Sequence, residues 1–303
     1  MASHTENYRG IVAMIGGCAC FSANDALTKL AAIDLPVSEI VAMRGLFTLL
    51  FAFLIIAARC EINRLPRIAD PYLLLRACIE GFTGVLIIYA LSLMPIADLT
   101  AILLAQPFLM TVIGVTLLGE QVGWRRWMAV IAGFAGMLLV MKPATAEFDQ
   151  VSLVALLAAF FVLGRDLLTR KIPAVVPTTV ITFATALASV PIGIAGALAE
   201  PWTVPGLFPF LVVVASAAFL VFAFILMVIA FRDTDVSAVS PFRYSLVVFA
   251  VIFGIILFGE IPDSVSFVGI GIIVAAGLYM LHREAMQRRA RTAVPVAGID
   301  PPH

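Results

Sequence analysis

Apolar segments long enough to cross a lipid bilayer follow one another along almost the whole chain of 303 residues. The hydrophobic fraction is 62% and the charged fraction only 13%, whereas a soluble domain is about half apolar and about a quarter charged. A core of this size cannot bury so much apolar surface, so lipid is the expected solvent. The ten expected spans are 11–32, 37–58, 72–93, 97–118, 125–141, 150–169, 177–198, 207–230, 236–258 and 264–281.

Two short motifs occur twice at nearly the same offset. Leu117-Leu118-Gly119-Glu120 returns as Leu257-Phe258-Gly259-Glu260, 140 positions later. The run from Asp25 to Lys29 returns from Asp166 to Arg170, 141 positions later. An odd number of spans in each copy makes the second copy enter from the opposite face of the membrane. The sequence therefore predicts an all-α membrane protein with two inverted five-helix repeats, 9–142 and 149–284, an arrangement usual in secondary transporters with a site between the halves.

Lysine and arginine predict the orientation of these spans. With the N-terminus inside, the cytoplasmic segments collect most of the basic residues, among them Arg9, Arg59, Arg64, Arg67, Arg125 and Arg126. The external loops hold little beyond Lys29 and Lys142. We therefore expect a multi-pass protein of the cell inner (cytoplasmic) membrane with both termini cytoplasmic. The first apolar run reads as a retained helix rather than a signal peptide, and residues 285–303 read as a disordered cytoplasmic tail.

Composition also excludes several functions. A formal net charge of zero, with scattered basic residues, argues against nucleic acid as a partner. The four cysteines lack metal-ligand spacing and the three histidines lie near helix ends or tails, so no metal and no cofactor is expected. The chain has no Gly-x-x-x-x-Gly-Lys motif and is not expected to hydrolyse ATP. The expected partners are a small-molecule solute and the lipid bilayer, and the sequence leaves monomer and homodimer open.

Charges within the spans are the best functional candidates, because each costs about 2.5–3.5 kcal/mol near the bilayer centre. Asp25 and Arg44 lie at equal depth in the first two spans, which predicts either an outer gate or a mutually neutralising pair. Arg165 and Asp166 lie near the cytoplasmic end of the sixth span, where we expect them to form an inner gate with Arg243. Inverted symmetry makes Asp166 the counterpart of Asp25. We also expect Lys29 to pair with Glu39 at the external surface.

Glu80 lies close to mid-membrane in the third span. No basic residue shares its face within one turn, since Arg76, one turn away, is nearer the cytoplasm. An isolated carboxylate at this depth favours its neutral form, which suits proton coupling or recognition of a cation; a hydrogen-bonded structural acid is the alternative. Gln106-Pro107-Phe108 predicts a kink in the fourth span, either as a ligand wall or as a plain kink. The residues expected to bind the solute are Asn24, Glu80, Gln106, Phe242, Arg243 and Tyr244, and those expected to gate are Asp25, Arg44, Arg165 and Asp166.

The repeat resembles a known superfamily. Its Gly-Glu turns, the segments Ser240-Pro241-Phe242-Arg243-Tyr244 and Phe258-Gly259-Glu260-Ile261-Pro262-Asp263, and the closing Arg283-Glu284 are similar to the EamA-type drug/metabolite transporters over residues 9–284. The resemblance implies ten helices, cytoplasmic termini and a central cavity. The substrates it implies include amino acids, purines, nucleotide-like metabolites, S-adenosylmethionine and riboflavin, and the Pro-Phe-Arg-Tyr segment looks most like carriers of the last two.

The expected function is alternating-access transport of a small organic metabolite such as riboflavin, S-adenosylmethionine, a nucleobase or an amino-acid-like solute, with proton coupling through Glu80. A passive facilitator or an exporter of drugs and metabolites remains open. The rival class is an intramembrane enzyme that uses Asp25 and Asp166, but the chain lacks His-Glu-x-x-His and Gly-x-Ser-x-Gly motifs, so we expect no enzyme. Glu80 and Gln106 correspond to Leu220 and Leu246 at the 140-position offset, so the expected site is asymmetric.

Overall fold

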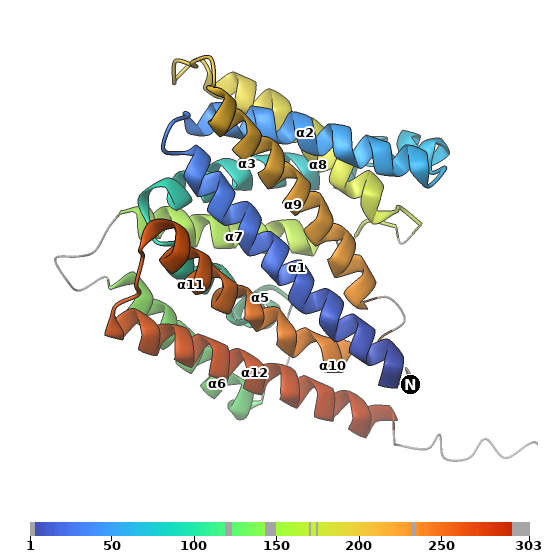
Figure 1. The fold of residues 1–303 in the computed structure, drawn as a ribbon. Coiled ribbons are helices and arrows are strands. Elements are labelled where there is room, and N and C mark those ends of the chain that lie inside the picture. The colour runs from blue at the N-terminus through green and yellow to red at the C-terminus, as the bar shows by residue number, and fades with distance from the viewer. Residues whose placement is uncertain are drawn as a thin grey trace, which may run out of the picture.

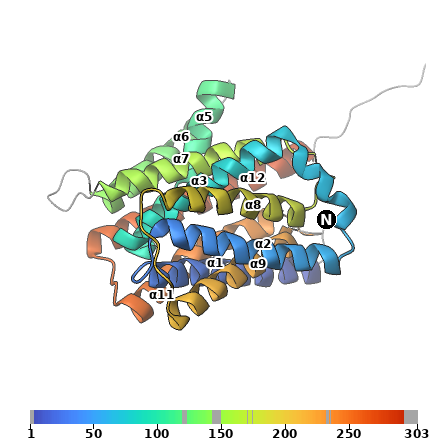
Figure 2. The ribbon, with the colours of Figure 1, turned by 90° about the horizontal axis from the view of Figure 1, so that it is seen from above.

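The computed structural model describes residues 4–118, 123–142, 150–169, 171–173, 175–231, 234 and 236–292. All regular elements within those ranges are helices, and they form one elongated bundle (Figures 1 and 2). Ten helical stretches of the described chain are long and apolar enough to cross a membrane. The predicted fold class, an all-α protein with ten membrane-spanning stretches, is confirmed.

The first half of the chain contains six α-helices and one 3-10 helix, which lies between the second and third spans. They are α1 (His4–Ala31), α2 (Val37–Ala58), η1 (Ile62–Ala69), α3 (Pro71–Leu93), α4 (Ile96–Leu104), α5 (Gln106–Leu118) and α6 (Trp124–Met141). The fourth span is divided at Ala105, one residue before Gln106-Pro107, because proline lacks the N–H that would continue the helix. The predicted kink is therefore confirmed.

The second half has a matching arrangement. Its elements are α7 (Val151–Thr169), α8 (Thr178–Gly196), α9 (Leu207–Phe231), α10 (Val236–Val239), η2 (Ser240–Tyr244), α11 (Ser245–Phe258) and α12 (Ser264–Thr292). The ninth span is divided like the fourth, with η2 preceding α11. Helix α12 continues to Thr292, so residues 285–292 are helical where the sequence predicted a disordered tail. Residues 293–303 of that tail lie outside the described residues.

Local signals explain where several helices begin and end. Asp70 caps α3, because its side chain accepts hydrogen bonds from the backbone N–H groups of Tyr72 and Leu73 at 2.9 and 3.1 Å. Pro71 occupies the first position of the helix, where a missing N–H does no harm. At the C-terminal end of α11, the residue that follows the helix is Gly259. Its φ is +66°, a conformation that glycine adopts without strain.

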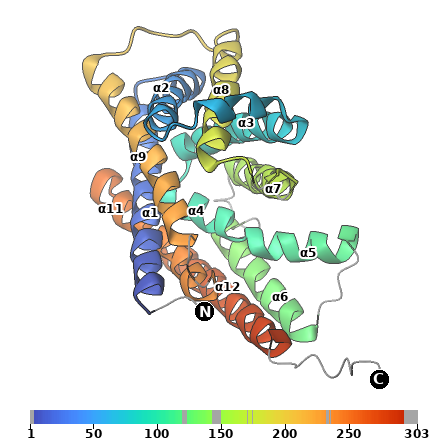
Figure 3. The ribbon, with the colours of Figure 1, turned by 90° about the vertical axis from the view of Figure 1, so that its right-hand side faces the viewer.

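Most of the extensive helix contacts join the two halves of the chain. Helix α1 packs along α9, α2 along α8, α3 along α7 and α6 along α12. Exchanging each helix for its counterpart in the other half gives the same set of pairs. The α1–α9 pair becomes the α7–α3 pair, while α2–α8 and α6–α12 are unchanged. Figure 3 shows α4 inside the bundle, with α1 and α9 on one side of it and α3 and α7 on the other. The interior is therefore lined by helices from both halves.

Small residues allow the closest of these contacts. A Cβ atom on Gly193 of α8 would lie 2.5 Å from the backbone nitrogen of Ala42 on α2. Helix packing in lipid depends on such close approaches, because the surrounding acyl chains are as apolar as the helix surfaces. The α2–α8 contact is therefore fixed by backbone geometry rather than by adjustable side chains.

Candidate functional site

A partly buried ion-pair cluster joins α3, α5 and α7. Arg165 Nη1 donates to both carboxylate oxygens of Glu80 at 2.9 and 2.8 Å, and Arg165 Nε donates to Asp166 Oδ1 at 2.8 Å. The other oxygen of Asp166 accepts a hydrogen bond from Gln106 Nε2. Glu80 is therefore paired, and the expectation of an isolated carboxylate is wrong. Its partner, Arg165, lies on another helix, 85 positions along the chain. The sequence pattern of α3 does not indicate which helix packs against Glu80.

Arg76 extends this cluster toward α8. Its side chain is buried, and it donates from Nε to Thr169 Oγ1 at 2.9 Å and from Nη1 to Thr185 Oγ1 at 2.8 Å. Its charge also acts on the carboxylates of Glu80 and Asp166. Arg76 was not among the predicted site residues, although its position one turn before Glu80 on α3 was a usable signal.

Asp25 of α1 and Arg44 of α2 lie close together without a direct bond. Each charge acts on the other, and the charge of Arg44 also acts on Glu80. No ion pair joins Asp25 to Arg44 in the described chain; the hydrogen bond that Asp25 Oδ1 accepts comes from Asn24 Nδ2, at 2.9 Å. Because Glu80 also holds Arg165, the predicted outer and inner pairs belong to one continuous cluster. We call Asn24, Asp25, Arg44, Glu80, Gln106, Arg165 and Asp166 the central cluster.

Three buried polar atoms in or next to the central cluster lack a hydrogen-bond partner among the described residues. They are Asn24 Oδ1, Thr28 Oγ1 and Thr48 Oγ1, on side chains that are almost wholly buried. Thr28 lies one turn beyond Asn24 on α1, and Thr48 lies one turn beyond Arg44 on α2. Buried polar atoms in proteins nearly always have partners, so atoms without one point to a ligand or water. Neither threonine was predicted as a site residue, although Thr28 belongs to the repeated Asp-to-Lys motif.

The Phe242-Arg243-Tyr244 segment lies in η2, away from the ion pairs. Arg243 is exposed, and no hydrogen bond or ion pair joins it to Arg165 or Asp166 in the described chain, so the expected inner cluster of three does not form. Tyr244 is buried, with its hydroxyl where a Cβ on Gly277 of α12 would stand. Phe242 is 38% exposed. The segment packs on α1, where Cys18 Sγ donates to the carbonyl oxygen of Arg243 at 3.5 Å.

Ionic contacts join the two halves at the end of the bundle opposite the N-terminus. Lys29 pairs with Glu260 and also donates to the carbonyl oxygen of Met94, while Glu260 Oε2 accepts from the backbone N–H of Ile96 at 3.2 Å. The side chains of Lys29 and Glu260 are only 11% and 20% exposed. The expected Lys29–Glu39 pair is wrong, because Glu39 instead accepts a hydrogen bond from the backbone N–H of a loop residue, Thr203.

A second ion pair, between Lys142 and Asp263, lies at the same end of the bundle. The hydrogen bond from Lys142 lowers the pKa of Asp263 to about 2. Asp263 also caps α12, since its Oδ1 accepts from the backbone N–H groups of Val265 and Ser266. Gly119, Glu120 and Arg170, the counterparts of Gly259, Glu260 and Lys29, lie outside the described residues.

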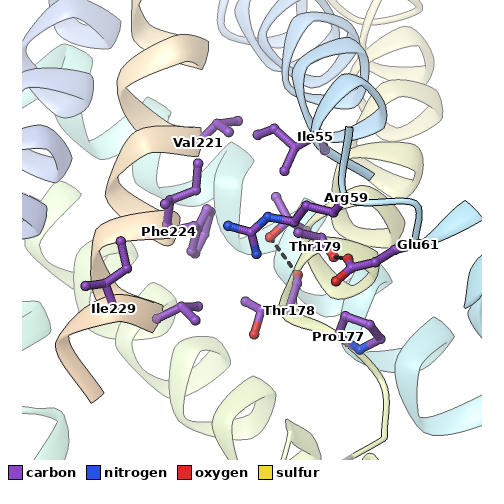
Figure 4. A pocket seen from close by; sticks show the side chains of 13 residues that line it. Ile55, Arg59, Glu61, Pro177, Thr178, Thr179, Val221, Phe224 and Ile229 are labelled. Atoms are coloured by element: carbon purple, nitrogen blue, oxygen red, sulfur yellow. Dashed lines mark hydrogen bonds between the residues drawn. The ribbon is translucent and has the colours of Figure 1, made fainter. Parts of the chain in front are cut away.

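A cavity of about 200 Å³ opens between α2, α8 and α9 near the end that carries the N-terminus (Figure 4). Its polar lining consists of Arg59, Glu61, Thr178, Thr179 and Thr182. Thr179 Oγ1 donates to Glu61 Oε2 at 2.6 Å, which engages one of the two oxygens of that carboxylate. Figure 4 shows the guanidinium of Arg59 extending into the open space toward Phe224. The remaining wall is apolar: Ala52, Ile55, Pro177, Val221, Phe224, Ile225, Val228 and Ile229.

Comparison with known proteins identifies relatives over most of the chain. The EamA-like transporter family matches residues 8–142 and 150–281. An S-adenosylmethionine uptake transporter of Rickettsia bellii is 28% identical over 87% of this chain and 90% of its own length. A pseudopaline exporter, CntI, of Pseudomonas aeruginosa is 25% identical over 90% of this chain and 96% of its own length. A riboflavin transporter of Vibrio cholerae is 27% identical over 64% of this chain and 65% of its own length.

A solved crystal structure has the same fold. It superposes with a TM-score of 0.63 over 93% of this chain and 98% of its own, at 20% sequence identity. At this identity the likeness concerns the fold alone. The relatives therefore identify a class of protein, whereas the contacts of this chain's own residues must indicate what it carries.

Proposed function

Because the chain belongs to the EamA-like transporter family and is a transporter rather than an enzyme, we propose that it carries a small organic metabolite across the bacterial inner membrane by alternating access. Helix contacts that are symmetric between the halves support two inverted repeats that rock against each other. On the orientation predicted by lysine and arginine, the N-terminus and the cavity at Arg59 face the cytoplasm.

The central cluster supports an amphoteric solute, one that bears both a positive and a negative group. Asp25 and Arg44 attract each other across a gap that no direct bond closes. Asn24, Thr28 and Thr48 place three unpaired polar atoms on the same two helices. A solute with an ammonium or sulfonium group for Asp25 and a carboxylate for Arg44 would satisfy both charges. S-adenosylmethionine has this chemistry and is the first candidate.

The same contacts move the proposed coupling site from Glu80 to Asp25. Arg165 holds both oxygens of Glu80, so that carboxylate is compensated whether or not a solute is bound. Asp25 has only the amide of Asn24 as a direct partner, so it is the one carboxylate of the central cluster without a direct cationic partner among the described residues. Intramembrane carboxylates of this kind serve as proton relays in transporters. Proton coupling, if present, would then use Asp25.

The ionic contacts at the external end support an outer gate that is closed in this conformation. Opening that end would break the Lys29–Glu260 pair and the two backbone contacts attached to it. At about 1 kcal/mol net for each hydrogen bond, losing them costs about 1–3 kcal/mol, a shift of about 5–150-fold between closed and open forms. Glu260→Gln is expected to raise external labelling of a cysteine placed at Thr28, and an unchanged labelling rate would remove Glu260 from the gate.

Uptake by purified protein in liposomes tests the function directly. The panel contains radiolabelled S-adenosylmethionine, riboflavin, nucleobases and amino acids, each with and without an inward proton gradient. We expect accumulation of an amphoteric solute that Asp25→Asn abolishes, while Glu80→Gln retains gradient dependence. Asp34→Asn, in the exposed turn after α1, is the matched control. Absence of flux for every solute in both directions would overturn the proposal, and transport by Asp25→Asn at the native rate would overturn the assigned coupling site.

Export is the second candidate direction, because the cavity faces the predicted cytoplasmic side and a similarly sized relative is named an exporter. Loading inside-out and right-side-out vesicles with the same solute separates the two directions. Faster gradient-driven movement out of the cytoplasm would assign export. If the solute equilibrates at the same rate with and without the proton gradient in both kinds of vesicle, the protein is a passive facilitator.

A further inference from the structure

The cavity at Arg59 lies on the inward side of α2. The outward side of this helix carries large exposed apolar side chains that face lipid, namely Leu46, Leu50, Phe53 and Leu54. The cavity-lining residues Ala52, Ile55 and Arg59 recur every three or four positions on the opposite side. The same stripe continues through Thr48 to Arg44. One face of α2 therefore runs from the cavity to the central cluster.

An aromatic pair lies between these two places. Phe224 of α9 lines the cavity and packs edge to face against Phe21 of α1, with ring centroids 5.4 Å apart. Phe21 lies one turn before Asp25 on α1. Beyond the pair, Thr48 carries one of the unpaired buried hydroxyl groups. The aromatic pair therefore stands where a path from the cavity to Asp25 and Arg44 would be closed.

The mouth of the cavity has a free positive charge. The side chain of Arg59 makes no hydrogen bond or ion pair with any residue that the structure describes, and its guanidinium extends into the cavity (Figure 4). One oxygen of the nearby Glu61 carboxylate accepts a hydrogen bond from Thr179, which holds that side chain against α8. The hydroxyl groups of Thr178 and Thr182 line the same wall. Together these groups suit a carboxylate, while the apolar face of α9 opposite them suits the uncharged body of an organic solute.

We infer that this cavity is a cytoplasmic loading subsite, in which Arg59 holds the carboxylate end of the solute before the solute passes Phe21 and Phe224 to the central cluster. The inference rests on the proposed transport function. A phospholipid headgroup has similar charge, but the lining faces away from the lipid side of α2, which favours a solute that enters from water. The subsite is distinct from the central cluster and acts only on the cytoplasmic face.

Cysteine labelling tests the subsite without knowledge of the solute. In a variant whose cysteines at positions 18, 20, 60 and 78 are replaced by serine, Thr182→Cys is treated with membrane-impermeant methanethiosulfonates. We expect labelling in inside-out vesicles and none in right-side-out vesicles. Leu50→Cys, on the lipid-facing side of α2, is the control and should stay unlabelled. Failure to label Thr182→Cys from the cytoplasmic side would overturn the inference.

The charge of the reagent then tests Arg59. A negatively charged sulfonate reagent should react faster than a positively charged trimethylammonium reagent, and Arg59→Gln should lower that ratio about tenfold. Arg59→Lys should restore it, and Arg64→Gln, on η1 outside the cavity lining, should leave it unchanged. If the ratio of the two labelling rates is the same with and without the Arg59 guanidinium, the role assigned to Arg59 is wrong. A rate that falls as phosphatidylglycerol is added to the vesicles would assign the cavity to lipid and also overturn the inference.

Transport kinetics at the two faces of the membrane give a third test of the subsite. With S-adenosylmethionine as the probe, Arg59→Gln should raise KM about tenfold when the solute is offered at the cytoplasmic face and less than about twofold at the external face, with little change in kcat. Equal changes at both faces would contradict a loading subsite. If the solute panel shows no flux while cysteine labelling still depends on Arg59, the transport proposal fails and the anion-binding cavity stands.

Discussion

Removing Arg165 should destabilise the protein more than removing either of its carboxylate partners. Arg165 supplies three charge-assisted hydrogen bonds, two to Glu80 and one to Asp166, from a side chain that is 19% exposed. Arg165→Met leaves both carboxylates without a direct cationic partner, and breaking a buried pair in this way costs about 3–5 kcal/mol. Glu80→Met leaves Arg165 with Asp166, so its expected cost is about 1.5–3 kcal/mol.

The double variant separates a structural pair from a functional carboxylate. Glu80→Met combined with Arg165→Met removes both charges, so the double variant should be more stable than the sum of the single changes predicts, by about 1–3 kcal/mol. The free energy of unfolding is measured by reversible denaturation in mixed micelles. Arg67→Met, at an exposed position of η1, is the control and should change stability by less than about 0.5 kcal/mol.

Additive costs would refute the reasoning. If the two single changes each cost less than about 1 kcal/mol and simply add, the pair contributes little to the fold. Glu80 would then be available for proton coupling, as the sequence alone suggests. A large coupling energy between Glu80 and Arg165 in the double-mutant cycle would indicate a structural pair. If the Glu80→Gln variant also transports the solute with unchanged dependence on the proton gradient, the role of Glu80 is to position Arg165.

Two further predictions concern helix packing and an interfacial charge. Gly193→Ala should lower the free energy of unfolding by about 1–3 kcal/mol, because the new Cβ meets the backbone of Ala42 and no rotamer change can relieve the contact. Gly271→Ala meets nothing within 4 Å and should be neutral or slightly stabilising in the same denaturation assay. Asp263 has a pKa lowered to about 2 by Lys142, so its contribution is complete above about pH 4 and is lost as the pH falls toward 2. Thermal unfolding of Asp263→Asn should therefore differ from the native protein at pH 6 and converge with it near pH 2, and parallel curves would contradict the pairing.

The ten spans could be predicted because the membrane imposes one requirement on each segment separately. Every span needs about 20 mostly apolar residues, whatever its neighbours are. The break at Gln106-Pro107 was equally local, because proline cannot continue the hydrogen-bonding of its own helix. The charged residues of the candidate site could also be predicted from the local sequence. A charged side chain within a span is costly to expose to lipid and therefore faces the interior of the bundle.

Their partners could not be predicted in the same way. Pairing by depth matched Lys29 with Glu39, but the end of α1 packs against loops of both halves, where Glu260 and the carbonyl of Met94 accept from it. Likewise, the direct cationic partner of Glu80 could not be predicted, because Arg165 approaches from α7 and not from the helix that carries Glu80. Depth in the membrane is one coordinate, and contact requires knowledge of the rotation and neighbours of each helix as well.

The amino-acid sequence by itself determined that this chain is an all-helical membrane protein, where its spans lie and which residues are costly to keep in lipid. Those properties follow from the solvent and from each segment's own composition. Only the tertiary structure decided that Glu80 is held by Arg165, that Asp25 and Arg44 are near without a direct bond, and that Arg59 faces an inner cavity. Such relations depend on packing between helices distant in the chain, where small residues such as Gly193 let two backbones meet.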